Sequence, residues 1–310
     1  MTAPRRIIID TDPGQDDAVA ILLAIALPEL FEILAITCVA GNVPVAQTTQ
    51  NALRIIELAG FPSIPVHAGC EAPMVIPLET GEFICGPDGL DGAGLGPAKG
   101  SLAPGHCVDA LIALLRNAPP KTITICALGP LTNIAMALRL APDIADRISE
   151  IVLMGGAMNL GNMTPAAEYN IYADPHAADV VLRAGIPTTL IGLHLTWHAI
   201  ASPAHIERLK SLGTKTGTAV HGMLTRPRVG AMGVGHPMHD VCVIGFLMWP
   251  ELFTGKDCFV EVETNAGPLR GRTTIDWRNR WRRPPNAHVL ETIEANPFFD
   301  RVIDALAKLP

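Results

Sequence analysis

The sequence has no excess of positive charge and no long uncharged apolar run. Its 23 lysines and arginines are outnumbered by 30 aspartates and glutamates, which gives a net charge of −7. Nucleic acids and anionic membranes attract basic proteins, so this balance argues against both as partners. The one dense basic patch, at Arg278, Arg280, Arg282 and Arg283, is better explained as a solvated loop or a subunit contact. No segment is long and apolar enough to span a bilayer.

The sequence also lacks paired cysteines and a leader segment. Its seven cysteines are odd in number, and none stands in a C-x-x-C pair. Several lie inside apolar runs, as Cys38 and Cys126 do, which predicts buried free thiols in a reducing compartment. Pro4-Arg5-Arg6 and the short apolar run that follows do not fit a signal peptide. We therefore expect a cytoplasmic protein.

The remaining composition is typical of a globular α/β protein. Apolar residues make up 49% of the chain and charged residues 17%, which excludes a disordered polymer. There is no internal repeat, low-complexity tract or linker, so we predict a single domain over 1–310.

Strand and helix patterns alternate over the first two thirds of the chain. This alternation predicts an open, mostly parallel, doubly wound (Rossmann-like) sheet flanked by helices. Strands are expected at 7–9, 32–39, 63–67, 122–127, 151–154 and 188–193, and helices at 16–27, 45–59, 108–117, 133–140 and 175–184. The last third predicts helices at 241–248 and 298–309, and a hairpin of 258–262 with 272–276 appended to the sheet. The stretch 69–105 is expected to be a long, functional loop.

The most informative stretch is Ile7-Ile8-Ile9-Asp10-Thr11-Asp12-Pro13-Gly14-Gln15-Asp16-Asp17. The isoleucines favour a buried parallel strand, Pro13-Gly14 favours a turn, and Asp16-Asp17 fall in the first turn of a helix. Four carboxylates thus gather where a strand ends and a helix begins, the usual ligand position of an open α/β sheet. Clustered buried carboxylates repel one another, which favours a hard cation such as Ca²⁺ or Mg²⁺. The alternative is that one aspartate caps the helix and the others are solvated.

Other polar residues also follow predicted strands, and in a parallel sheet they would share its carboxyl edge. They are Asn42, the Leu128-Gly129 turn, Met154 with an Asn-rich loop after it, and His239-Asp240 before a helix. Asparagine can bind sugar hydroxyls, a held cation can take up a diol and a water, and a histidine can protonate a leaving group. The set suits hydrolysis of a bond next to a diol, as in a riboside. Each residue also has a structural interpretation: turn formation for Asn42 and Asn170, a helix cap for Asp240, and core packing for Met154.

The run Asp10 to Ala18 resembles the signature of the nucleoside hydrolase family, the inosine-uridine preferring nucleoside hydrolases. The likeness extends over nearly the whole chain through further motifs in family order: Ala40-Gly41-Asn42, Leu128-Gly129-Pro130-Leu131-Thr132-Asn133-Ile134-Ala135, Met154-Gly155-Gly156, Ala167-Glu168-Tyr169-Asn170, Asp174-Pro175 and His239-Asp240. The resemblance implies an open α/β domain, a homodimer or homotetramer, that hydrolyses purine or pyrimidine ribonucleosides to ribose and free base.

By matched position, the resemblance also implies the role of each site residue. Asp12 would be the general base acting on a Ca²⁺-bound water, and His239 the acid that protonates the leaving base. The Ca²⁺ ligands would be the carboxylates of Asp12, Asp17 and Asp240 and the carbonyl of Leu128. The residues holding the ribose would be Asp16, Asn42, Asn162, Glu168 and Asn170, with Met154 under the ring and Asp10 as a supporting residue.

One position departs from the family pattern, because Cys85-Gly86 stands where many members carry His-Gly. Substrate preference is therefore open, and the base-binding residues are expected in loops around 75–92 and 219–239. Trp197, Trp277 and Trp281 could stack on a base, but core or interface roles explain them better.

Two other classes of protein remain as alternatives. A haloacid dehalogenase-like Mg²⁺-dependent phosphatase would use Asp10 as nucleophile and Asp12 as acid. Its pattern continues with Gly-Thr after the second aspartate and has a late Gly-Asp-x-x-x-Asp strand end, and neither is present. A non-catalytic nucleoside-binding protein on the same fold is the second alternative.

Overall fold

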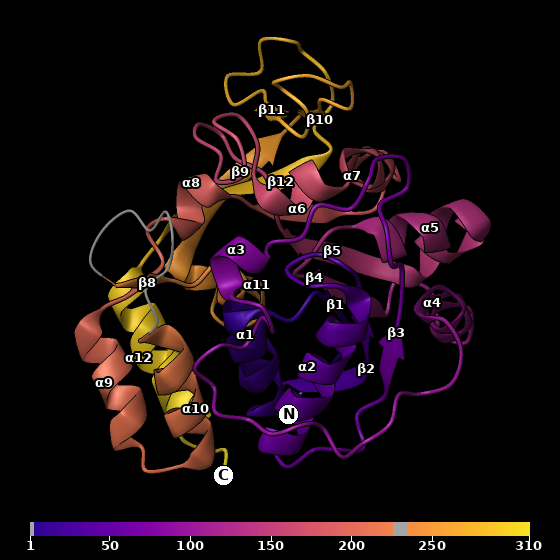
Figure 1. Ribbon diagram of the computed structural model, residues 1–310. Coiled ribbons are helices and arrows are strands. Elements are labelled where there is room, and N and C mark those ends of the chain that lie inside the picture. Colours follow the sequence, from indigo (N-terminus) through magenta and orange to yellow (C-terminus); the bar gives the residue numbers. More distant parts are fainter. Residues whose placement is uncertain (1–2, 226–234) are drawn as a thin grey trace.

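An eight-stranded sheet forms the centre of the molecule in the computed structural model, which describes residues 3–225 and 235–310 (Figure 1). Its spatial order is β3-β2-β1-β4-β5-β6-β12-β9. The strands are β1 (Arg5–Thr11), β2 (Phe31–Cys38), β3 (Val66–Ala68), β4 (Ile123–Ala127), β5 (Ile148–Met154), β6 (Thr188–Ile191), β9 (Phe253–Cys258) and β12 (Ala287–Ile293). All neighbours are parallel except β12 and β9, which are antiparallel. The predicted mostly parallel α/β fold is confirmed.

Helices cover both faces of this sheet, and β1 shows why. Ile7 and Ile9 point into one apolar cluster and Ile8 into the other, and all three are fully buried. Burying one such side chain contributes about 1.5–3 kcal/mol, which explains a strand without polar alternation. The first cluster includes α1 (Gln15–Ile25), α2 (Val45–Leu58), α11 (Val241–Met248) and α12 (Ala295–Leu306). The second includes α4 (Cys107–Arg116), α5 (Thr132–Leu140) and α7 (Pro175–Leu182).

The remaining helices and strands complete the described part of the chain. They are α3 (Glu82–Cys85), α6 (Tyr169–Ala173), α8 (Leu193–Thr196), α9 (Pro203–Ser211), α10 (Lys215–Leu224), the 3-10 turns η1 (Pro142–Arg147) and η2 (Pro250–Leu252), and strands β7 (Ile200–Ala201), β8 (His236–Pro237), β10 (Val260–Val262) and β11 (Thr273–Ile275). Among the described residues, no helix has the length and apolar character needed to cross a membrane.

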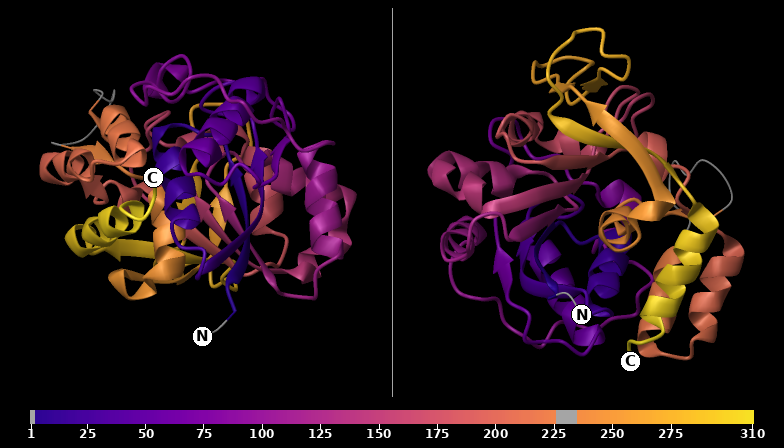
Figure 2. Two further views of the ribbon diagram at one scale, coloured as in Figure 1. Left: turned by 90° about the horizontal axis from the view of Figure 1, so that it is seen from below. Right: turned by 180° about the vertical axis from the view of Figure 1, so that it is seen from behind.

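The expectation that the late hairpin extends the central sheet is wrong. Strands β10 and β11 pair with each other and form a separate two-stranded sheet. The predicted segment 258–262 spans two strands, because Cys258 still pairs with Ala287 of β12 whereas Val260 pairs with Ile275 of β11. The hairpin projects from the body at the end away from α9, α10 and α12 (Figure 2).

Candidate functional site

The turn between β1 and α1 holds Asp17 with two hydrogen bonds. Its Oδ1 accepts the hydroxyl of Thr11 at 2.6 Å, and its Oδ2 accepts the backbone N–H of Gly14 at 3.0 Å. Asp17 therefore caps α1 from the first turn, where the helix dipole favours a carboxylate. It is also fully buried, and burial together with the charge of Asp16 raises its pKa. The cap explains one aspartate and leaves the others to be explained.

Asp12 lies beside Asp17 and is held by the end of β2. Its Oδ2 accepts the backbone N–H of Asn42 at 2.7 Å, and the Asn42 side-chain amide donates to the Asp12 carbonyl at 3.1 Å and to Asp17 Oδ2 at 3.3 Å. Burial and the charge of Asp17 raise the pKa of Asp12 well above its ordinary value. Gly41 and Gly129 leave room for this carboxylate, since a Cβ on either would collide with it.

Asp10 lies in β1, two residues before Asp12, and is completely buried. Its Oδ2 accepts the hydroxyl of Thr37 at 2.6 Å and the side-chain amide of Asn133 at 2.9 Å. Burial raises the pKa of Asp10 to about 7, although these two bonds oppose the shift. Asn133 also accepts the backbone N–H of Cys70 at 2.8 Å. The Asp10 contacts thus join β1, β2 and the start of α5, as a supporting residue would.

Three carboxylates form a group that could hold a metal ion. One oxygen from each of Asp16, Asp17 and Asp240 lies within 4.8 Å of the others, and all three residues are buried. Burial, followed by the charge of Asp16, raises the pKa of Asp240 well above its ordinary value. Such a donor set, all oxygen and all acidic, suits a hard divalent cation. Asp12 is not one of the three.

One cavity brings together nine of the twelve residues singled out from the sequence. These are Asp16, Asn42, Leu128, Met154, Asn162, Glu168, Asn170, His239 and Asp240, and Ile84 and Tyr169 complete the lining. Asp10, Asp12 and Asp17 are buried and do not line the cavity. Strands β1, β2, β4 and β5 all present their carboxyl ends here, which explains how residues so far apart in sequence meet.

The Glu168–Asn170 segment forms one wall of the cavity. Glu168 caps α6: its Oε1 accepts the N–H of Asn170 at 2.8 Å, and its Oε2 accepts those of Gly156 at 2.9 Å and Ile171 at 3.2 Å. Burial raises the pKa of Glu168 to about 7 against these bonds. The Asn170 amide donates to the carbonyl oxygens of Leu128 at 2.6 Å and Met154 at 3.1 Å, so it joins the ends of β4 and β5.

His239 also lines the cavity. Its backbone N–H donates to Asp16 Oδ2 at 3.1 Å, and its Nδ1 lies 2.7 Å from the hydroxyl of Thr196. The Trp197 ring meets the imidazole edge-on, with centroids 5.2 Å apart. Sequence reasoning missed Thr196, because neither its type nor its position in a short helix marks it as functional.

The predicted base-binding loops contribute Ile84 to the cavity. Its neighbour Cys85 is 4% exposed and does not line the cavity. The Cys85 thiol lies 3.3 Å from the carbonyl oxygen of Gly81 and 3.6 Å from that of Asn42. It therefore links α3 to the loop that follows β2. Within the loop around 219–239, residues 226–234 lie outside the described residues.

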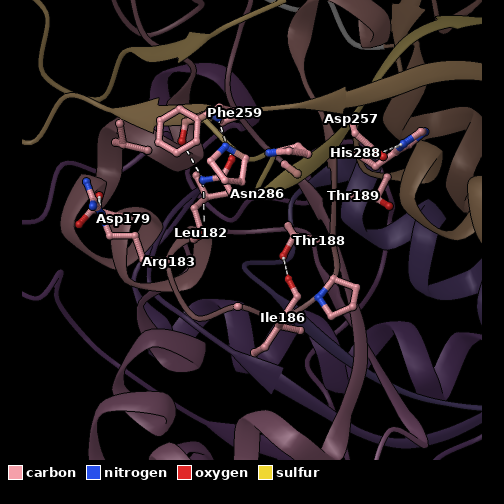
Figure 3. Close-up of a pocket in the computed structure, with 17 residues that line it drawn as sticks. Asp179, Leu182, Arg183, Ile186, Thr188, Thr189, Asp257, Phe259, Asn286 and His288 are labelled. Atoms are coloured by element: carbon pink, nitrogen blue, oxygen red, sulfur yellow. Dashed lines mark hydrogen bonds and ion pairs between the residues drawn. The ribbon is translucent and has the colours of Figure 1, made fainter. Parts of the chain in front are cut away.

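A larger cleft of about 800 Å³ lies between α7, the start of β6 and strands β9 and β12 (Figure 3). At one end Arg183 forms an ion pair with Asp179 at 2.6 Å, and at the other His288 Nδ1 lies 2.7 Å from Asp257 Oδ1. None of the residues singled out from the sequence lines this cleft. The convergent acidic and amide groups identify the smaller cavity as the candidate site.

Comparison with known proteins gives one consistent result. The family model described as inosine-uridine preferring nucleoside hydrolase matches residues 7–300. The non-specific ribonucleoside hydrolase RihC of Salmonella typhi is 39% identical over all of both chains. The inosine-uridine preferring nucleoside hydrolase of Leishmania major is 39% identical over 99% of this chain and 98% of its own. A solved plant nucleoside hydrolase, PpNRh1, superposes with a TM-score of 0.91 at 31% identity, covering 98% of this chain and 99% of that one.

Proposed function

The chain belongs to the inosine-uridine preferring nucleoside hydrolase family, and from this we propose that the cavity between Asp16 and His239 is its active site. The family makes it a hydrolase of N-glycosyl bonds that releases the free base from a ribonucleoside. One observation carries the assignment of the site: residues from six separate segments, each matching a family motif, line a single cavity.

The metal ion is proposed to be Ca²⁺. Asp17 and Asp240, two of the three clustered carboxylates, would hold it together with Asp12 and the Leu128 carbonyl. Asp16 is the third carboxylate of that cluster. The raised pKa values of these carboxylates agree with the need for a cation, since each reflects burial among like charges. When bound, the ion supplies Lewis-acid chemistry that makes water more acidic and fixes a diol.

Asp12 is proposed as the general base. It takes a proton from the water that attacks the anomeric carbon, while the bond from that carbon to the base nitrogen breaks. The sugar develops oxocarbenium character in this step, and the carboxylates beneath the cavity stabilise the positive charge. The hydrogen bond from Asn42 to Asp12 Oδ2 keeps the carboxylate oriented for the transfer.

The ribose would lie in this cavity, against its polar lining residues. Asp16, Asn42, Asn162, Glu168 and Asn170 offer carboxylate and amide groups for its hydroxyls, with Met154 under the ring. Ile84 and Tyr169 are additional lining residues, and they give the base an apolar surface. His239 would complete the reaction by donating a proton to the departing base, which is otherwise a poor leaving group.

The test is a substrate panel of inosine, adenosine, guanosine, uridine, cytidine and p-nitrophenyl riboside, assayed for reducing sugar with and without chelator. Chelator-sensitive turnover of any member supports the assignment, and the ranking reports base preference. Binding without turnover in the Ca²⁺-loaded protein would indicate a nucleoside-binding protein instead. Phosphate release from a phosphomonoester would support the phosphatase alternative, which the comparisons do not favour.

We further propose that residues 1–310 act as one catalytic domain in a cytoplasmic homodimer or homotetramer. The family model spans nearly the whole chain, which agrees with a single domain. Sedimentation of the purified protein tests the oligomer, and a monomer at micromolar concentration would refute it.

A further inference from the structure

We infer that Thr196 is a positioning residue for His239: its hydroxyl holds the imidazole so that Nε2 faces the leaving base. The inference rests on the proposed function, in which His239 donates the proton. Thr196 Oγ1 lies 2.7 Å from His239 Nδ1, a strong hydrogen-bond distance. Thr196 is completely buried and His239 is 5% exposed, so water does not compete effectively for this bond.

Backbone hydrogen bonds join the two segments that carry Thr196 and His239. Strands β7 and β8 pair Ile200 with Pro237 and Ala201 with His236, between the two side chains in sequence. The backbone N–H of Met238, next to His239, donates to the carbonyl oxygen of Ala199 at 2.9 Å. The pairing of β7 with β8 thus keeps Thr196 and His239 close together. The hydrogen bond from the His239 backbone N–H to Asp16 also fixes the position of His239.

A hydroxyl is well suited to hold a ring that exchanges protons. When the imidazolium gives up the proton on Nε2, Nδ1 keeps its own proton, so the threonine oxygen accepts a hydrogen bond from Nδ1–H before and after the transfer. Because Thr196 occupies Nδ1, a contact of the ring with a leaving base has to use Nε2. Threonine is also β-branched, which restricts its χ1 rotation and hence the position of the hydroxyl.

The structural alternative is that the bond merely satisfies a buried hydroxyl. A helical threonine ordinarily does this locally, by donating to the carbonyl four residues earlier. In the part of the chain that the structure describes, the Thr196 hydroxyl instead makes its one hydrogen bond to His239, and the Gly192 carbonyl accepts the Thr196 backbone N–H. The hydroxyl is therefore directed at the functional ring.

The test compares Thr196→Val, which removes the hydroxyl at nearly constant shape, with Thr196→Ser, which keeps it. The Val variant should lose roughly 10- to 100-fold in kcat on inosine, because a misplaced ring donates its proton poorly, with KM within about threefold. Turnover of p-nitrophenyl riboside should change less than about threefold, since that leaving group needs no proton. The Ser variant should recover most of the inosine rate.

Two controls separate positioning from stability. Thr216 in α10 is as deeply buried, but its hydroxyl has no partner among the described residues, so Thr216→Val should leave both substrates unaffected. In a His239→Ala background, Thr196→Val should cause no further loss on inosine, because both changes remove the same proton donor. Thr196→Ala provides the same comparison if the Val variant does not fold.

Equal losses on both substrates, an additive loss with His239→Ala, or an unchanged inosine rate in a folded Val variant would each overturn the role of Thr196. These outcomes require that the unaltered protein hydrolyses inosine. Absence of turnover in that protein would instead refute the proposed function.

Discussion

Asp12 Oδ2 accepts the backbone N–H of Asn42 at 2.7 Å, in a bond that joins the carboxyl ends of β1 and β2. The same carboxylate lies against Gly41 and Gly129, at each of which a Cβ would collide with it. The Asn42 N–H thus orients the Asp12 carboxylate, and the lack of a Cβ at Gly41 and Gly129 leaves the space that it occupies. A proton acceptor this constrained is preorganised for its water, which is what a general base requires.

Replacement of Asp12 should separate catalysis from stability. Asp12→Asn can still accept the Asn42 N–H but cannot take a proton, so we expect kcat to fall by about 10²–10⁴-fold in a folded protein. Asp12→Ala should abolish turnover, with nucleoside binding weakened but detectable. It also leaves a buried N–H without an acceptor, which costs about 1–3 kcal/mol. Steady-state kinetics and thermal unfolding of both variants check this, and an Asn variant with native kcat would exclude Asp12 as the base.

Gly41→Ala should damage the site more than the fold. The added methyl displaces the Asp12 carboxylate, so kcat is expected to fall at least about tenfold, because misplaced reacting groups lose rate steeply. The matched control is Gly96→Ala, since a Cβ at Gly96 meets nothing within 4 Å. Circular dichroism should show folded protein for both variants. Equal kinetics of the two would mean that the position of Asp12 does not limit the rate.

Cation removal should lower stability as well as activity. Chelation removes the positive charge that would offset the mutual repulsion of the buried carboxylates of Asp16, Asp17 and Asp240. Added Ca²⁺ should therefore raise the free energy of unfolding, by about 2.7 kcal/mol at a hundredfold excess over Kd, and the Tm should rise with the Ca²⁺ concentration. Asp17→Asn should flatten this dependence. A Tm that is indifferent to both chelator and Ca²⁺ would refute the site, and a larger response to Mg²⁺ would refute the choice of ion.

The β1–α1 turn could be predicted from the sequence, and so could the meeting of strand-end residues such as Asn42 and Leu128 at one edge of the sheet. Elements without an apolar pattern, and the contacts that they make, could not. Three isoleucines, a Pro-Gly turn and paired aspartates specify β1 and the start of α1 within eleven residues. Strand β9 was missed because four of its six residues, Thr254 to Asp257, are exposed and none of them has a large apolar side chain, so it has neither an apolar run nor an alternation. Thr196 was missed for a different reason: its partner His239 lies 43 residues away, across a pairing of two-residue strands that no periodicity reveals.

Glu168 should make stability fall as pH rises towards neutrality. Burial places its folded-state pKa at about 7, above the ordinary 4.5, so the folded chain binds this proton more tightly than the unfolded chain. The resulting stabilisation is complete below about pH 4.5 and is lost as pH rises through about 7. Its full size is on the order of 3 kcal/mol.

Glu168→Gln removes the titrating proton while keeping the side-chain shape. The difference in unfolding free energy between the unaltered protein and this variant should therefore decline from pH 4.5 to about 7 and stay level above it. The slope is the informative quantity, because the amide also changes the N–H bonds from Gly156, Asn170 and Ile171 at every pH. Denaturant unfolding at four or five pH values, in chelator, measures it. A flat difference would mean that these three donors hold Glu168 as a carboxylate throughout, with its folded pKa near the ordinary value.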